Sequence, residues 1–264
     1  MPSTAPIPAS PCPVTLFGLE ILPARFAEAV DILERAVEQR LPGAKSVFTP
    51  NVDHIVRLDT HPEWRSFYAQ ANYLFADGMP VIWASRLLGK PLPERVTGAD
   101  LFVALCHRAV ARQWQVVVLG GMPGEEQKLE NLFAQVYPGL LVRVMCPSMQ
   151  FQPDGQEGQE AADRIRAMAP DLVFVCLGLP KQERWIIRHA PGFPHGVTLG
   201  VGASMEFALG LKKRAPIPIQ RLGFEWLWRL LSDPKRLWRR YLKEDPRFLA
   251  LCWREYRRSR VRGS

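Results

Sequence analysis

Short runs of β-branched and other apolar residues alternate along the chain with longer stretches in which apolar residues recur every three or four positions. In residues 25–39, for example, Phe26, Val30, Leu33 and Val37 fall on one helical face. This alternation predicts a mostly parallel sheet with helices on both faces. We expect strands at 14–17, 45–49, 73–76, 115–119, 140–145, 172–177 and 197–201, and helices at 25–39, 62–71, 99–112, 125–136, 157–168 and 181–189.

The predicted fold class is therefore α/β, with a Rossmann-like sheet followed by a C-terminal helical appendage. No strand pattern follows residue 201. Asp233-Pro234 and Asp245-Pro246 each combine an N-cap residue with proline at the first helical position, which predicts tail helices near 219–232, 234–243 and 246–260. We predict a disordered segment at 1–13, an α/β domain at 14–210 and an appendage at 211–264.

The composition of the 264 residues is that of an ordinary globular protein, with 47% hydrophobic and 23% charged residues. Apolar runs stay far below the roughly 20 residues of a spanning helix, and the N-terminus has no signal-peptide pattern. The five cysteines are scattered and form no C-x-x-C pair. We therefore expect neither a disulfide framework nor a zinc knuckle. The cysteine pattern fits a protein of the reducing cytosol.

Positive charge is concentrated at the C-terminus. Residues 210–264 contain 16 Lys and Arg against 5 Asp and Glu, a net charge of +11, whereas residues 1–209 carry −3. The same segment holds four of the eight tryptophans. Basic and aromatic residues together indicate an anionic partner, either a membrane surface or a nucleic acid.

Polar loops, four of which contain glycine, follow five of the predicted strands. Because the carboxyl ends of parallel strands meet at one edge of a sheet, we expect these loops to form a single ligand cleft. The loops are 49–53, 77–80, 120–124, 178–183 and 202–204.

Several common site motifs are missing from the sequence. There is no phosphate-binding P-loop motif, and the Gly200-Val201-Gly202 run lacks the third glycine of the dinucleotide fingerprint, which disfavours NAD. There is no G-x-S-x-G or H-E-x-x-H motif, and the histidines have no metal-ligand spacing. We therefore expect neither a cofactor nor a metal site.

Eight sequence runs, in order, resemble one enzyme family. They are T-P-N-V-D (49–53), F-A-D-G-M-P (75–80), R-V-T-G-A-D (95–100), L-G-L-P-K-Q-E-R-W (177–185), G-V-G-A (200–203), R-A-P (214–216), G-F-E-W-L-W-R-L (223–230) and P-K-R-L-W-R-R-Y-L (234–242). The chain thus resembles the WecG/TagA/CpsF glycosyltransferases, family 26 of the glycosyltransferases. The resemblance covers about residues 14–245, and we expect the stretch 247–262 to extend beyond a typical member.

The resemblance implies an enzyme of bacterial surface polysaccharide synthesis. Members transfer a sugar, with inversion, from a UDP-sugar to an undecaprenyl-diphosphate-linked acceptor. They act without a metal and lie peripherally on the cytoplasmic face of the inner membrane, and some self-associate. Their donors include N-acetylmannosamine, its uronic acid and glucose, and the sequence does not distinguish among these sugars.

The resemblance also assigns site residues. Inverting transfer needs a base for the acceptor hydroxyl proton, and Asp77, directly before Gly78, matches that base. The family's appendage is thought to bring arginines to the donor diphosphate; with no D-x-D motif, cationic side chains would have to compensate the charge of the leaving UDP. The other matching positions are substrate-binding Thr49, Asn51, Arg95 and Gln182, and diphosphate-binding Arg229, Arg236 and Arg239.

Ordinary structural roles stand beside these assignments. Asp77 and Asn51 could cap helices, Thr49 could end a strand, and Arg95 could form a surface ion pair. Two other functions also stay open, a noncatalytic sugar-nucleotide-binding partner and a nucleic-acid-binding protein with a basic tail. The candidate base argues against the former, while the acidic body and a tail suited to a bilayer interface argue against the latter.

Overall fold

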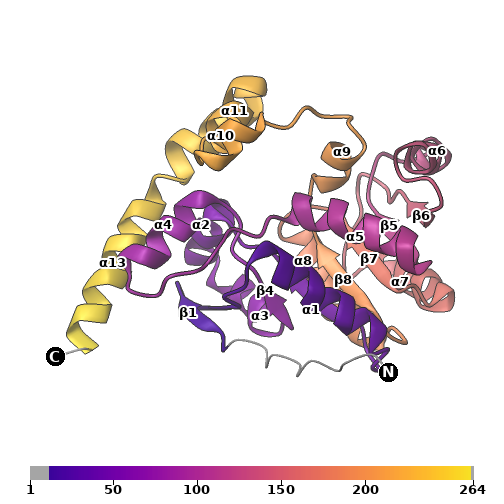
Figure 1. The fold of residues 1–264 in the computed structure, drawn as a ribbon, viewed down its shortest axis with the longest axis horizontal. Helices are drawn as coiled ribbons and strands as arrows, with labels where there is room; N and C mark the ends of the chain where they lie inside the picture. The colour runs from indigo at the N-terminus through magenta and orange to yellow at the C-terminus, as the bar shows by residue number, and fades with distance from the viewer. Residues whose placement is uncertain (1–11, 263–264) are drawn as a thin grey trace, which may run out of the picture.

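The computed structural model describes residues 12–262, so positions 1–11 of the predicted disordered segment 1–13 lie outside the described residues. The core of the protein is a six-stranded parallel sheet in the order β4-β3-β8-β7-β5-β6 (Figure 1). This confirms the predicted α/β class. The strands are β3 (Lys45–Phe48), β4 (Tyr73–Leu74), β5 (Gln115–Leu119), β6 (Leu141–Met145), β7 (Leu172–Val175) and β8 (Val197–Gly200).

Helices cover both faces of this sheet because successive strand residues alternate between two apolar clusters. Val117 and Val173 pack in one cluster with α2, α4, α7 and α8, whereas Val116 and Phe174 pack in the other with α1, α5 and α6. Burial on both faces explains why the strands read as continuous apolar runs. The helices before the tail are α1 (Phe26–Glu38), α2 (Val52–Thr60), η1 (Pro62–Trp64), α3 (Arg65–Ala69), α4 (Met79–Leu87), α5 (Gly98–Arg112), α6 (Glu126–Val136), α7 (Gln156–Met168), α8 (Lys181–His189), η2 (Ala190–Gly192) and α9 (Ser204–Ala208).

The predicted strand at 14–17 forms outside the main sheet. β1 (Val14–Leu16) pairs antiparallel with β2 (Leu19–Ile21), which the pattern did not predict. Phe17 and Gly18, between the two strands, have φ values of 53° and 75°, as a two-residue hairpin turn requires. The predicted helix at 62–71 is also shorter, because it consists of the 3₁₀ turn η1 and the five-residue α3.

The tail after α9 is helical as predicted, and the described residues beyond β8 contain no strand. The predicted helix at 219–232 is divided at Gly223, whose φ is +80° and whose added Cβ would lie 2.8 Å from Cβ of Met79 in α4. The predicted helix at 234–243 changes from α to π geometry at Arg240. The tail elements are α10 (Ile217–Arg221), α11 (Glu225–Ser232), α12 (Pro234–Arg239), η3 (Arg240–Glu244) and α13 (Arg247–Arg262).

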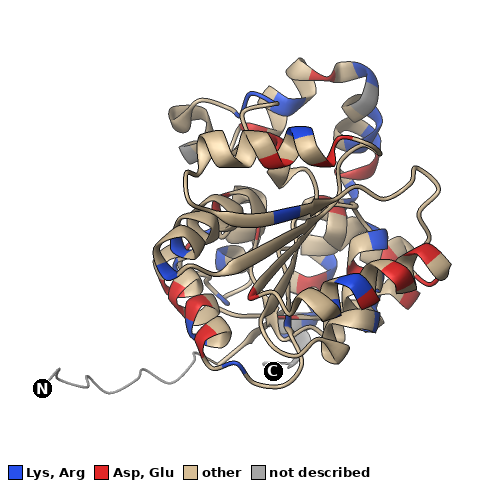
Figure 2. Cartoon of the chain, turned by 90° about the vertical axis from the view of Figure 1, so that its right-hand side faces the viewer, with Lys and Arg blue, Asp and Glu red and all other residues tan. Residues whose placement is uncertain are grey.

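The tail is packed onto the body along α2 and α4 (Figure 1). Phe248, Leu251 and Cys252 of α13 are buried in the apolar cluster that contains α2, and the Phe248 ring lies 5.2 Å from that of Phe17. Lys and Arg recur along the tail helices (Figure 2). Among residues 12–262 no helix combines the length and hydropathy needed to cross a bilayer.

Candidate active site

A cavity of about 340 Å³ lies between the carboxyl ends of β3 and β4 and the tail. Ligands of open α/β sheets bind at this edge. Of the five loops expected to converge, those after β3 and β4 line the cavity, and the loops at 120–124, 178–183 and 202–204 do not. The body contributes Asn51, Val52, Asp77, Gly78, Met79, Pro80 and Arg95, and the tail contributes Gly223, Glu225, Trp226, Arg229, Arg240, Tyr241, Asp245, Pro246, Phe248 and Leu249.

Asp77 occupies the loop between β4 and α4. Its backbone N–H donates to the carbonyl oxygen of Pro50 at 3.0 Å, which joins the loops after β3 and β4. Burial raises the pKa of Asp77 to about 6, although the Arg229 guanidinium opposes this shift. A carboxylate with a pKa close to neutral is well suited to accept a proton from a substrate hydroxyl.

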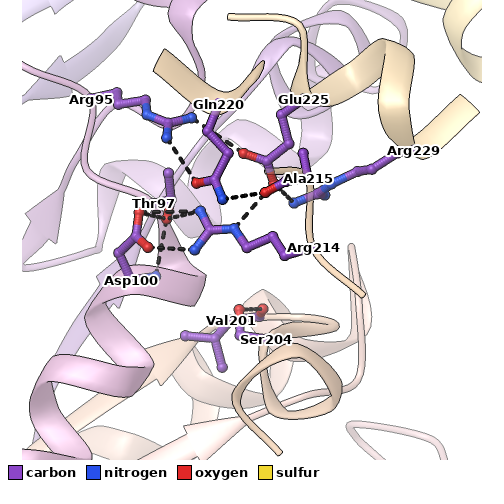
Figure 3. A network of polar contacts seen from close by, with 10 residues as sticks. All are labelled: Arg95, Thr97, Asp100, Val201, Ser204, Arg214, Ala215, Gln220, Glu225 and Arg229. Carbon is purple, nitrogen blue, oxygen red and sulfur yellow. Dashed lines mark hydrogen bonds and ion pairs between the residues drawn. The ribbon is translucent and has the colours of Figure 1, made fainter. Parts of the chain in front are cut away.

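Three arginines surround the Glu225 carboxylate on the tail side of the cavity (Figure 3). Guanidinium nitrogens of Arg229, Arg95 and Arg214 lie 2.6, 3.2 and 3.4 Å from its oxygens. Burial alone would raise the pKa of Glu225, but the three arginines lower it below its usual value. Glu225 is therefore ionised near neutral pH and partly neutralises the arginines beside Asp77.

The same network ties the tail to the start of α5. Arg214 donates to Asp100 at 3.2 Å, and Thr97 caps α5 by accepting the Asp100 N–H at 3.0 Å. Arg95 also donates to Gln220, whose amide in turn donates to the carbonyl of Ala215 (Figure 3). The R-V-T-G-A-D and R-A-P runs of the sequence thus meet in one polar interface.

Two arginines at the cavity have donors that are not used within the described part of the chain. Nε of Arg229 and Nε of Arg240 are buried and have no hydrogen-bond acceptor there. The Arg229 guanidinium lies over the Phe207 ring at 5.1 Å. Nε of Arg240 lies 3.6 Å from an Asp53 oxygen and 3.9 Å from an Asp245 oxygen, so two carboxylates already compensate its charge without a hydrogen bond. Buried unsatisfied donors are costly, so an anionic ligand that accepted from them would be favoured.

The predicted substrate-binding residues occupy three different environments. Asn51 lines the cavity, although its Oδ1 also accepts the His54 N–H at 3.3 Å and caps α2. Arg95 lines the cavity within the Glu225 network. Thr49 is buried against Gly98 and is not part of the cavity lining.

Gln182 is buried away from the cavity and braces two loops. Its Oε1 accepts the N–H groups of Gly178, at 3.2 Å, and of Gly202, at 2.9 Å. Its amide nitrogen donates to Glu183, which is completely buried. Burial raises the pKa of Glu183 to about 7. The two residues thus hold together the loops after β7 and β8.

Two of the three predicted diphosphate-binding arginines line different cavities. Arg229 lines the cavity beside Asp77, whereas Arg239 is 75% exposed and lines a neighbouring cavity, 3.5 Å from Glu244. The side chain of Arg236 lies outside the described residues. Sequence reasoning missed Arg240, the first residue of η3, which lines the first cavity.

Glu225 and Arg214 were also missed as site residues. Both stand inside the quoted family runs, at 223–230 and 214–216, and that is the signal which could have identified them. Within residues 12–262 no three His, Cys, Asp or Glu side chains are grouped as metal ligands.

A family model described as the Glycosyl transferase WecG/TagA/CpsF family matches residues 14–262. The match includes 247–262, so the expectation that this stretch lies beyond the family pattern is wrong. A Bacillus spizizenii protein is 31% identical over 226 residues, 85% of this chain and 84% of that protein. A Staphylococcus aureus strain MW2 protein is 33% identical over 236 residues, 89% of this chain and 90% of that protein. Both are named N-acetylglucosaminyldiphosphoundecaprenol N-acetyl-beta-D-mannosaminyltransferase.

Proposed function

The chain belongs to the WecG/TagA/CpsF family of glycosyltransferases, and from this we propose that it transfers a sugar, with inversion, from a UDP-sugar to an undecaprenyl-diphosphate-linked saccharide. The relatives' printed name supports the lipid-linked acceptor. The product would serve the synthesis of a bacterial surface polysaccharide or exopolysaccharide. The observation that carries the proposal is a single cavity in which Asp77 lies beside the arginines of the tail.

In the proposed mechanism Asp77 is the general base. Its carboxylate takes the proton of the acceptor hydroxyl while that oxygen attacks the anomeric carbon of the donor sugar. The bond between the anomeric carbon and the diphosphate oxygen breaks, and UDP leaves with the electron pair. The pKa of about 6 supports this role, because Asp77 is then mostly ionised at pH 7 and still basic enough to accept a proton.

The cationic side chains would stabilise the leaving diphosphate. Arg229 is supported by its unsatisfied Nε donor, and Arg95 and Arg240 by their position on the same cavity. Charge compensation from fixed guanidinium groups would allow transfer without a divalent metal. Arg236 stays a proposed diphosphate ligand on its family motif. Arg239, predicted in the same role, lines the neighbouring cavity, and Arg240 takes its place in this proposal.

The remaining family positions would act in two ways. Asn51 would contact the sugar or the acceptor from the cavity wall, because it lines the same space as Asp77. Thr49 and Gln182 would support the site by holding the loops after β3, β7 and β8 in place. Substrate contact by these two residues would need a rearrangement of the loops.

We propose a peripheral position on the cytoplasmic face of the inner membrane. The tail exposes large apolar side chains between its cations, including Trp238 and Trp253, which are 44% and 63% exposed. Tryptophan and basic residues together favour the membrane interface. A lipid-linked acceptor would then reach the cavity by diffusion within the leaflet.

The test is a donor screen. The purified protein is incubated with each of several UDP-sugars and a synthetic polyprenyl-diphosphate-sugar acceptor, in buffer with and without EDTA, and product is identified by mass spectrometry. We expect one UDP-sugar to give a β- or α-linked product of inverted configuration, with equal yield in EDTA. Transfer from none of the donors would overturn the proposed reaction, and a strict need for added Mg²⁺ would overturn its metal independence.

A further inference from the structure

A second cavity, of about 430 Å³, lies on the other side of the contact between α2 and the tail. One wall is the C-terminal half of α2 with His61, and the other consists of the end of α12, η3 and the start of α13. It shares no lining residue with the cavity that contains Asp77. The mechanism proposed above gives this space no part in sugar transfer.

Positive charge dominates the lining of this second cavity. Arg57, which is paired with Asp53 at 2.8 Å, lines it together with Arg239, Lys243 and Arg247. Against these four cationic side chains there is one lining carboxylate, Glu244. That carboxylate is divided between two of them, because it lies 3.8 Å from Arg57 and 3.5 Å from Arg239. A concave surface lined by one sign of charge concentrates the field and attracts an ion of the opposite sign.

Two exposed apolar side chains neighbour the cavity residues in the chain. Trp238 and Leu242 directly precede the two cavity residues Arg239 and Lys243, and they are 44% and 60% exposed. The Lys243 Nζ lies 5.1 Å from the centroid of the Trp238 ring, so cation and aromatic surface are adjacent. A free inorganic anion would gain nothing from these apolar side chains, whereas a phosphate attached to a hydrocarbon chain would contact both surfaces.

We propose that this basic cavity binds the phosphate group of a membrane lipid. Two lipids carry that chemistry in the proposed setting, the polyprenyl diphosphate of the acceptor and an anionic phospholipid. The guanidinium and ammonium groups would donate charge-assisted hydrogen bonds to phosphate oxygens, and Trp238 and Leu242 would lie against the hydrocarbon. The inference is independent of sugar transfer, because it concerns lipid binding alone.

The experiment compares two variants of the full chain that remove equal charge from the tail. K243Q/R247Q removes two cations from the cavity lining, and R257Q/R258Q removes two exposed cations from α13 outside it. Binding is measured by co-sedimentation with phosphatidylcholine vesicles that contain either undecaprenyl diphosphate or phosphatidylglycerol, at matched surface charge. No sugar donor is present, so failure of the proposed transfer reaction would not affect the result. Circular dichroism and the thermal midpoint check folding. If the double variant is unfolded, K243Q is compared with R257Q, so that each variant still removes one charge.

Loss of any two cations near an anionic surface should weaken binding by about thirtyfold. We expect K243Q/R247Q to lose about tenfold more than R257Q/R258Q on one of the two vesicle types, which then identifies the lipid. If K243Q/R247Q loses more binding than R257Q/R258Q on both vesicle types, the site is also supported, and it then accepts the phosphate of either lipid. Equal losses for the two variants on both vesicle types would overturn the proposal, since only the overall charge of the tail would then matter.

Discussion

At the scale of single residues, the site depends on how burial and nearby charge act on two carboxylates. Burial raises the pKa of Asp77, whereas the three arginines around Glu225 lower the pKa of that carboxylate. The two groups face the same cavity. At neutral pH Glu225 is therefore ionised, whereas Asp77 has a pKa close enough to neutral to gain and lose a proton. Each carboxylate leads to a different prediction.

Replacing Asp77 by Asn should lower kcat by roughly 10²–10⁴, the usual loss when a general base is removed. UDP affinity, measured by calorimetry, should be unchanged or slightly higher, because a negative charge is lost beside the arginines. In the wild type, protonation removes the base, so kcat/KM should fall as the pH decreases through about 6. Near-normal turnover of D77N would exclude Asp77 as the base.

Replacing Glu225 by Gln should strengthen UDP binding by about tenfold, since the carboxylate would compete with the diphosphate for Arg95 and Arg229, which line the cavity. Glutamine keeps hydrogen-bonding capacity at the same position. Calorimetric titration of UDP at low and moderate salt measures the change. Weaker binding in E225Q would mean instead that the carboxylate is needed to arrange the arginines.

At the scale of secondary-structure elements, the periodic pattern predicted the main sheet and most helices of the body. It missed β2, α2, α4 and α9, which are short or begin inside loop motifs, so they contain too few turns to show a period. The tail was predicted to be helical, but local spacing could not reveal the π segment that begins at Arg240. The family run 234–242 contains both Arg239 and Arg240, and of the two it is Arg240 that lines the cavity beside Asp77.

The arginine pair at this junction offers a matched comparison, because each variant removes one charge from adjacent positions. R240Q should weaken UDP binding by about tenfold, as expected for loss of a charge-assisted contact to phosphate. R239Q should change UDP affinity less than threefold, roughly the effect of one distant charge. If R239Q had the larger effect, the tail would adopt a different register when the nucleotide is bound.

At the scale of the whole molecule, the tail is both a wall of the cavity and part of the apolar core. Ten of the cavity-lining residues come from the tail, and Phe248 and Leu251 are buried in the body's core. Topology places the carboxyl ends of β3 and β4 together, which the sequence could predict. The tail, more than 100 residues after Asp77 in the chain, forms the other wall of the cavity. No local sequence pattern predicts such a long-range contact.

Deletion of residues 211–264 should therefore abolish transfer even to a water-soluble acceptor, for which membrane attachment is irrelevant. The thermal midpoint should also fall, because α2 and the β1–β2 hairpin lose their apolar cover. A coupled enzyme assay for released UDP measures the activity. Full-rate transfer by the truncated chain would exclude a catalytic role of the tail and leave it membrane attachment alone.

The buried Glu183 beneath the loops has a consequence for how folding depends on acidity. Its pKa is about 7 in the folded protein, against an ordinary value of 4.5, so the folded chain holds a proton that the unfolded chain releases between these pH values. This contribution to the free energy of unfolding is complete below pH 4.5 and is lost as the pH rises through 7, about 3 kcal/mol in all. Denaturant titrations at pH 5 and pH 8 should therefore differ less in E183Q than in the wild type, and an equal difference would mean that Glu183 stays ionised. With a pKa of about 7, Glu183 itself should take up a proton from the buffer when the chain folds at pH 6.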